Sequence, residues 1–200
     1  MAAGRSRRWA LPETPGRAGW CGRLLVATPE LTEGVFARSV VQLLQHAPGS
    51  GAFGVVLTSP TATPLAELLP GWALLAPDPA VVFEGGPVQE SVAICLGRLA
   101  VPAAEDPSYV VVEGVPWLAT LDLDLEAADA VQEVRVFAGY AGWSAGQLEA
   151  EVEQGGWWVL DALPGDCFSI EPQRLWRQVL RRQGLPLALA ASYPADPSLN

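Results

Sequence analysis

The stretch that decides the fold is GYAGWSAGQLEAEV, residues 139–152. It follows the apolar run Val134–Phe137, which has the length and composition of a strand. Ser144 with Gln147 three residues later forms a capping-box pattern, which predicts that a helix begins there. We therefore expect Gly139–Trp143 to be a tight turn that carries the chain from a strand directly into a helix.

Outward from this turn, short apolar runs separated by turn residues predict strands along most of the chain. They are residues 24–27, 35–47, 53–57, 80–83, 91–96, 109–113, 117–121, 134–137 and 157–160. Helical spacing predicts helices at residues 64–69, 125–131, 144–154 and 171–183. Many strands with few, late helices indicate one α+β domain with coiled, mostly antiparallel or mixed sheets. We expect a flexible arm at residues 1–21, the domain at 22–190 and a tail at 191–200.

Charge is unevenly distributed along the 200 residues and limits the partners. Residues 1–23 carry a net charge of +4, residues 24–170 carry −16 and residues 171–200 carry +2. So acidic a body repels a phosphate backbone, which argues against nucleic-acid binding. No apolar run approaches the roughly 18 residues that would cross a membrane. Three cysteines without CxxC spacing favour a reducing compartment, and therefore the cytoplasm.

The sequence lacks a recognisable catalytic or metal-binding pattern. His46 is the only histidine, and we interpret it as a residue at the end of a hairpin that hydrogen-bonds its own turn. No G-x-S-x-G motif or H-x-x-x-H pair is present. The acidic cluster at residues 122–129 could hold a divalent cation, but it is more typical of a solvated start of a helix. We expect no catalytic residue, no metal and no cofactor.

Three glycine-rich corners are the candidate binding features. They lie at residues 49–51, 83–89 and 137–144. A strand that runs through glycines into a helix leaves free N–H groups at the positive end of the helix dipole, which suits an anion. A purely structural turn explains the same glycines. The candidate ligand-binding residues are Arg38, Ser39, Glu84, Gly85, Gly86, Gly139, Gly142, Trp143 and Ser144.

Together, GYAGWSAGQLEAEV, FEGGPVQ (residues 83–89) and GRLLVATPELTEGVFARSVV (residues 22–41) resemble the AlgH/YqgE-like family of bacterial proteins. The resemblance covers about Gly22 to Gly184. It implies a single α+β domain with bifurcated, coiled sheets, and it places Phe36–Val40 on a strand. The family name comes from a proposed regulatory role in alginate production. The chain departs from the family at Thr58-Ser59-Pro60, where members usually carry an Asn-Arg-Pro-like sequence.

Arg38 would lie between apolar positions of that strand, where a buried guanidinium needs an acidic partner. Glu84 and Glu149 are the candidates, and such a pair would anchor the glycine corners. We expect a cytoplasmic, non-enzymatic binding or regulatory module that does not bind DNA directly. The alternative is an enzyme or binder that acts on a small anionic ligand at the glycine corners. A homo-oligomer is compatible with either.

Overall fold

The computed structural model describes residues 19–32, 34–100 and 105–193. Their strands are β1 (Leu24–Ala27), β2 (Val40–Ala47), β3 (Gly51–Val56), β4 (Pro60–Pro64), β5 (Val81–Glu84), β6 (Val88–Leu99), β7 (Tyr109–Val111), β8 (Leu118–Leu121), β9 (Val131–Trp143) and β10 (Trp157–Leu160). The helices are α1 (Leu65–Leu68), α2 (Pro70–Ala73), α3 (Gln147–Glu153), α4 (Leu175–Arg181) and α5 (Leu187–Ala190), with 3-10 turns η1 (Gly34–Phe36) and η2 (Pro172–Arg174).

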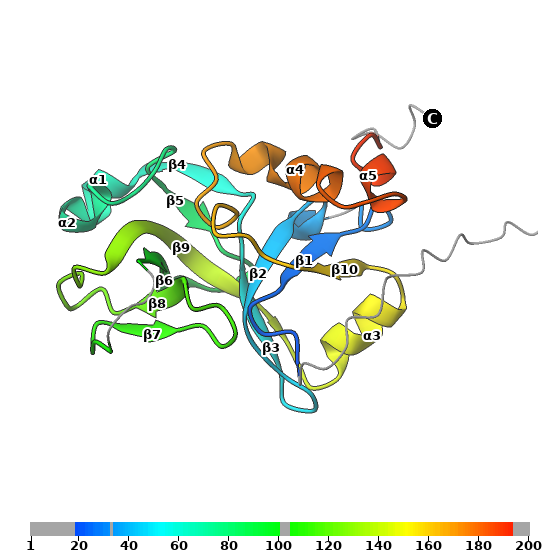
Figure 1. Cartoon of the computed structure of the whole chain (residues 1–200), viewed down its shortest axis with the longest axis horizontal. Coiled ribbons are helices and arrows are strands. Elements are labelled where there is room, and N and C mark those ends of the chain that lie inside the picture. The colour runs from blue at the N-terminus through cyan, green and yellow to red at the C-terminus, as the bar shows by residue number, and fades with distance from the viewer. Residues whose placement is uncertain (1–18, 33, 101–104, 194–200) are drawn as a thin grey trace, which may run out of the picture.

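The strands join in one curled sheet of order β10-β1-β2-β3-β9-β6-β8-β7, and β5 attaches β4 to the side of β9 (Figure 1). All pairs are antiparallel except that of β5 with β9. The predicted α+β class and the mostly antiparallel sheet are therefore confirmed. In this part of the chain, no helix is long and apolar enough to cross a membrane.

Strand β9 is shared by the two halves of the sheet. Its first half pairs with β6 and β5, whereas its last residues pair with β3, where Trp143 lies opposite Ala52. β9 pairs with β6 as far as Tyr140 and with β3 from Ala141, so the change of partner comes just after Gly139, which has a φ of 70°. Such a φ strains any residue with a Cβ, so glycine permits the bend there. The bifurcated sheet that the family resemblance implied follows from this bend.

The expected tight turn at Gly139–Trp143 is wrong, because β9 runs through both glycines to Trp143. The turn comes later, at Ser144–Gly146, and α3 begins at Gln147 with Gly146 as its N-cap. Ser144 is therefore not the N-cap. One half of the predicted capping box does form, because Gln147 Oε1 accepts the backbone N–H of Ser144 at 3.0 Å.

Some of the other predicted elements are confirmed, and some are wrong. The hairpin of β2 and β3, the pairing of β7 with β8, and a short helix inside residues 64–69 are confirmed. A strand over Phe36–Val40 is wrong, because the chain forms η1 and then passes through Arg38 at a φ of 55° before β2 begins. A helix at residues 125–131 is also wrong, because these residues are irregular up to Val131, where β9 begins.

Three apolar clusters fill the two sides of the curled sheet. The largest lies beneath α4, whose predicted inward residues Leu175, Trp176, Val179 and Leu180 are all buried. Trp176 also donates its indole N–H to the carbonyl of Ala27 at 2.8 Å, which fixes α4 to β1. The second cluster lies under α1 and α2, and the third lies under α3.

Candidate functional site

Two of the predicted glycine corners meet, and they meet as tightly packed backbone. The N–H of Gly85 donates to the carbonyl of Ala138 at 2.8 Å. A Cβ on Gly86 would lie 2.3 Å from the carbonyl carbon of Tyr140, and one on Gly139 would lie 2.7 Å from the Gly86 oxygen. Such distances are shorter than a van der Waals contact allows. The absence of a Cβ at Gly85, Gly86 and Gly139 therefore allows the backbone between β5 and β6 to pack directly against β9.

The C-terminal end of the corner at residues 137–144 is also packed against protein side chains. Trp143 is buried and donates its indole N–H to Glu151 Oε2 at 2.9 Å, and Trp157 donates to the same oxygen at 2.9 Å. Gln147 Nε2 donates to Glu151 Oε1 at 3.0 Å. A carboxylate that accepts several hydrogen bonds is well stabilised. Glu151, which sequence reasoning missed, thus closes the end of β9 where Gly142 is exposed.

Arg38 lies away from the glycine corners. Its Nη2 donates to the carbonyl of Tyr193 at 2.7 Å, and its guanidinium carbon lies 5.1 Å from the centre of the Trp176 ring. The expected ion pair of Arg38 with Glu84 or Glu149 is wrong: Glu84 is exposed, and Glu149 contacts His46. Arg38 is also only partly buried, so it does not need the acid that a buried strand position would have required.

Its neighbour Ser39 is buried instead. The residue is 1% exposed, and its hydroxyl has no hydrogen-bond partner in the described part of the chain.

His46 is buried and uses both ring nitrogens. Its Nδ1 accepts the backbone N–H of Trp20 at 2.8 Å, so the ring proton lies on Nε2, which donates to Glu149 at 3.1 Å. The Trp20 indole also stacks on the ring with 4.8 Å between centroids. His46 therefore bonds the N-terminal segment and α3, and not its own turn as expected. With both nitrogens engaged, the ring has none left to act as a base.

The three thiols are equally unsuited to nucleophilic chemistry. Burial raises the pKa of Cys95 to about 12 and raises the pKa of Cys167 well above its ordinary value. Burial also raises the pKa of Cys21, whose thiol donates to the carbonyl of Leu44 at 3.1 Å. Because the thiolate is the reactive form, a raised pKa lowers reactivity near neutral pH.

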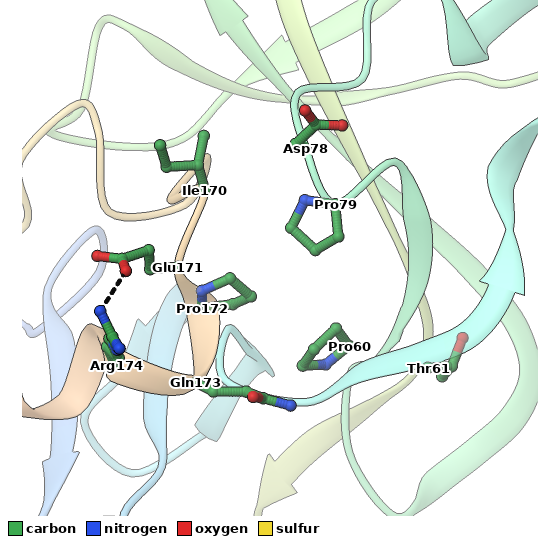
Figure 2. A pocket seen from close by; sticks show the side chains of 9 residues that line it. All are labelled: Pro60, Thr61, Asp78, Pro79, Ile170, Glu171, Pro172, Gln173 and Arg174. Carbon is green, nitrogen blue, oxygen red and sulfur yellow. Dashed lines mark hydrogen bonds and ion pairs between the residues drawn. The ribbon is translucent and has the colours of Figure 1, made fainter.

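The described part of the chain has a cleft between β4, the segment just before β5 and η2, which we call the proline-walled cleft (Figure 2). Its volume is about 570 Å³. Its lining residues are Pro60, Thr61, Asp78, Pro79, Ile170, Glu171, Pro172, Gln173 and Arg174. The three proline rings gather around its centre. Sequence reasoning missed this cleft because its walls come from three separate parts of the chain.

Most polar groups of the proline-walled cleft already have partners. Arg174 donates to Glu171 at 2.6 Å, and the same carboxylate accepts a hydrogen bond from Gln178. The hydroxyl of Thr61 donates to the carbonyl of Val82 at 2.6 Å. Among the described residues, the Asp78 carboxylate has no such bond and is exposed. The cleft thus offers apolar rings, a neutralised ion pair and one free carboxylate.

Arg135 joins two of the three chain segments that form this cleft. It is 3% exposed and donates to the carbonyl of Ser169 at 3.0 Å and to that of Asp78 at 3.3 Å. Its guanidinium lies 4.3 Å from the centre of the Phe83 ring. Burial lowers the pKa of Arg135 to about 10, which leaves it charged at neutral pH. A charged residue inside the apolar run 134–137 was the signal for it in the sequence.

Metal binding finds no support in residues 19–32, 34–100 and 105–193. They contain no group of three or more His, Cys, Asp or Glu side chains placed to hold an ion. In the acidic cluster at residues 122–129, Asp122 Oδ1 accepts the backbone N–H of Asp124 at 3.0 Å, which is a local turn.

Comparisons with known proteins bear on the whole chain. The sequence model of a family described as AlgH-like matches residues 24–188. A UPF0301 protein of Streptomyces avermitilis is 48% identical over 190 residues, which cover 90% of this chain and 94% of that protein. A UPF0301 protein of Thermobifida fusca is 45% identical over 195 residues, covering 92% and 97% respectively.

Solved structures agree on the fold. The crystal structure of a Corynebacterium diphtheriae protein matches with a TM-score of 0.82 and 29% identity, covering 91% of this chain and 95% of that one. The solution structure of the AlgH protein from Pseudomonas aeruginosa matches with a TM-score of 0.65 and 26% identity, covering 92% and 98%.

Proposed function

The chain belongs to the AlgH-like family, and we propose that it acts as a non-enzymatic binding module whose partner occupies the proline-walled cleft. The observation that carries this proposal is the chemistry of the lining. The cleft has the size and the mixed apolar and polar walls of a binding site. Its hydroxyl donates to the Val82 carbonyl, and one of its two carboxylates is paired with Arg174.

Reactive groups elsewhere support the same proposal. A hydrolase of the Ser–His or Cys–His type would need His46, and both nitrogens of that ring are engaged. The thiols of Cys95 and Cys167 are buried, and their raised pKa values disfavour the thiolate. The module would therefore act by holding or releasing a partner, which is the form that a regulatory role would take.

The charge of the cleft favours a partner that combines an apolar side chain with a positive charge. Asp78 carries a free carboxylate, while Arg174 is neutralised by Glu171. The chain as a whole carries −10. Ile170, which is 72% exposed, offers an apolar contact at the rim. We therefore prefer a segment of a partner protein with adjacent apolar and basic residues to the small anion that the glycine corners suggested.

We also propose that the module works in the cytoplasm. Its three cysteines are free thiols, a state that a reducing compartment maintains. Fractionation of cells that express the chain with an epitope tag would test this, and recovery in a secreted or membrane fraction would contradict it.

The binding proposal is testable with two probes that share an apolar residue and carry opposite charges, N-acetyl-leucyl-arginine amide and N-acetyl-leucyl-glutamate amide. We expect the arginine probe to shift amide NMR signals around Asp78 and Ile170, and to bind about tenfold more tightly than the glutamate probe, a difference of ~1.4 kcal/mol. Ile170→Arg should weaken this binding through repulsion. Leu74→Arg is the matched control, because Leu74 is 91% exposed and lies outside the cleft.

Equal binding of both probes would contradict the proposed charge preference. Shifts confined to residues away from the cleft, or an Ile170→Arg variant that binds like the Leu74→Arg control, would contradict the proposed site.

A further inference from the structure

The proline-walled cleft presents an apolar side chain and a free carboxylate at one end. Figure 2 shows Ile170 and Asp78 at the same end of the cleft, on facing walls. Ile170 is 72% exposed, and the Asp78 carboxylate makes no hydrogen bond or ion pair in the described part of the chain. A ligand that satisfies both groups covers an apolar surface and supplies a positive charge.

A stretch of that composition lies near the start of the chain, at RSRRWALP, residues 5–12. Residues 1–18, to which it belongs, lie outside the described residues. They contain four arginines and one glutamate, a net charge of +3, whereas residues 19–200 carry −13. The acidic body therefore attracts this segment.

The body holds the chain at Gly19 and Trp20, so the basic segment is tethered there. Trp20 donates its backbone N–H to His46 Nδ1 at 2.8 Å, and its indole stacks on the same ring with 4.8 Å between centroids. Gly19 packs so closely that a Cβ on it would lie 2.9 Å from the His46 carbonyl oxygen. Because His46 is buried on β2, this tether has a fixed position relative to the sheet.

The cleft lies within reach of the tether. The part of β2 from His46 back to Val40 is about 20 Å long. Val40 accepts the N–H of Leu57 at 2.8 Å, and Pro60 of the cleft follows about 10 Å further along the chain. The straight distance from the tether to the cleft is therefore at most about 40 Å. Arg5–Trp9 precede the tether by ten to fourteen residues, a length that spans about 33–50 Å when extended.

We propose that the segment Arg5–Leu11 occupies the proline-walled cleft of its own chain and competes there with an external partner. An arginine of the segment would pair with the Asp78 carboxylate, and the indole of Trp9 would cover the proline rings and Ile170. The inference rests on the proposed function, because it names the internal competitor for the same cleft.

Tethering makes a weak contact sufficient. A short flexible connection gives the segment an effective concentration on the order of 1 mM at the cleft. A contact with a Kd of about 0.3 mM would then fill the cleft roughly three quarters of the time, and it would weaken an external ligand about fourfold. The cleft would thus be partly closed to partners until the segment leaves.

The test is an NMR titration of the full chain with N-acetyl-leucyl-arginine amide, repeated on the full-length double variant Arg7→Ser/Arg8→Ser. We expect the double variant to bind the probe about fourfold more tightly. Without probe, the amide signals around Asp78 and Ile170 should already differ between the two chains. Trp9→Ser should act in the same direction, which diffuse attraction between charges would not produce.

Arg177→Ser/Arg181→Ser is the matched control. It removes the same charge from exposed positions of α4 that do not line the cleft, and it should bind the probe like the unchanged chain. The signals around the cleft should be the same at about 50 μM and about 1 mM chain, because a contact within one chain does not depend on concentration.

Four outcomes separate this inference from the proposed function. Equal probe affinity in the double variant and the unchanged chain, with equal signals around the cleft, would overturn the internal competitor and leave the proposed function standing. An equal gain in the α4 control would reduce the effect to net charge and also overturn it. Signals that move on dilution would assign the occupant to a second copy instead. A probe that binds neither chain would contradict the proposed function, and the probe-free signals would still decide whether the segment lies in the cleft.

Discussion

At the scale of single residues, His46 carries the clearest structural role. It accepts from Trp20, donates to Glu149 and stacks on the Trp20 indole. His46→Ala leaves the Trp20 N–H without a partner and removes the stacking surface. We expect a loss of about 2–4 kcal/mol in the free energy of unfolding, measured by urea denaturation. Faster hydrogen exchange at the Trp20 amide should accompany it.

The matched control is Gln45→Ala, on the preceding and exposed position of the same strand. Substitutions at such positions change stability by about 0.5 kcal/mol or less. If His46→Ala behaved like Gln45→Ala, the two bonds of the ring would contribute little and the role assigned to His46 would be wrong.

Single residues also show where sequence reasoning reached its limit. It expected a buried, partnered guanidinium at Arg38, yet that environment belongs to Arg135, which is 3% exposed. Both arginines stand next to apolar residues in the sequence. What separates them is the distant chain that packs against each one. The carbonyls of Ser169 and Asp78 lie against a buried Arg135, whereas Arg38 contacts the Tyr193 carbonyl and the Trp176 ring and stays partly exposed. The spacing of apolar residues around each arginine does not indicate which distant segments will pack against it.

At the scale of elements, β9 decides the architecture, and Gly139 is the residue on which its bend depends. In Gly139→Ala the new Cβ would lie 2.7 Å from the Gly86 oxygen at a φ of 70°. Backbone must move to relieve this contact. We expect a loss of about 2–4 kcal/mol in the free energy of unfolding, or failure to fold, checked by chemical denaturation.

Gly142→Ala is the matched control in the same motif. Its φ is not in the positive range, and its nearest contact is the Tyr140 ring edge at 3.3 Å. A flexible side chain can yield by a few tenths of an ångström, so we expect a change of about 1 kcal/mol or less. Equal effects at both glycines would mean that the bend in β9 does not rest on the backbone of Gly139.

The elements that were predicted correctly are those whose secondary structure is determined by their own residues. β1, β10 and α4 follow from apolar runs and from helical spacing within a few residues. The turn at Gly139 and the helix at 125–131 failed for one reason, which is that β9 takes its course from its neighbours. The pairing of Val131 with Leu99 begins it, and the crossing with Gly86 bends it. Such pairing joins residues that are distant in the sequence, and the glycines that it requires are its only local signal.

At the scale of the whole molecule, the proposed binding cleft is assembled from distant segments. The proline-walled cleft joins residues 60–61, 78–79 and 170–174, and Arg135 fixes two of these walls from a fourth. The sequence predicted the fold class, but it contained no sign that a cleft would open where β4 and β5 leave the main sheet.

The buried thiols make the stability of the whole domain sensitive to high pH. The pKa of Cys95 is about 12 in the folded chain against an ordinary value of 9.0, so folding favours its protonated form. This contribution is complete below pH 9 and is lost as the pH rises from 9 toward 12. At pH 10 we expect the free energy of unfolding to be about 1.4 kcal/mol lower than below pH 9 because of this loss. Cys95→Ala should remove that part of the slope in urea denaturation at pH 8–10. Val136→Ala, which shortens the residue opposite Cys95 on β9, should lower stability but keep the slope, and equal slopes in both variants would contradict the assignment.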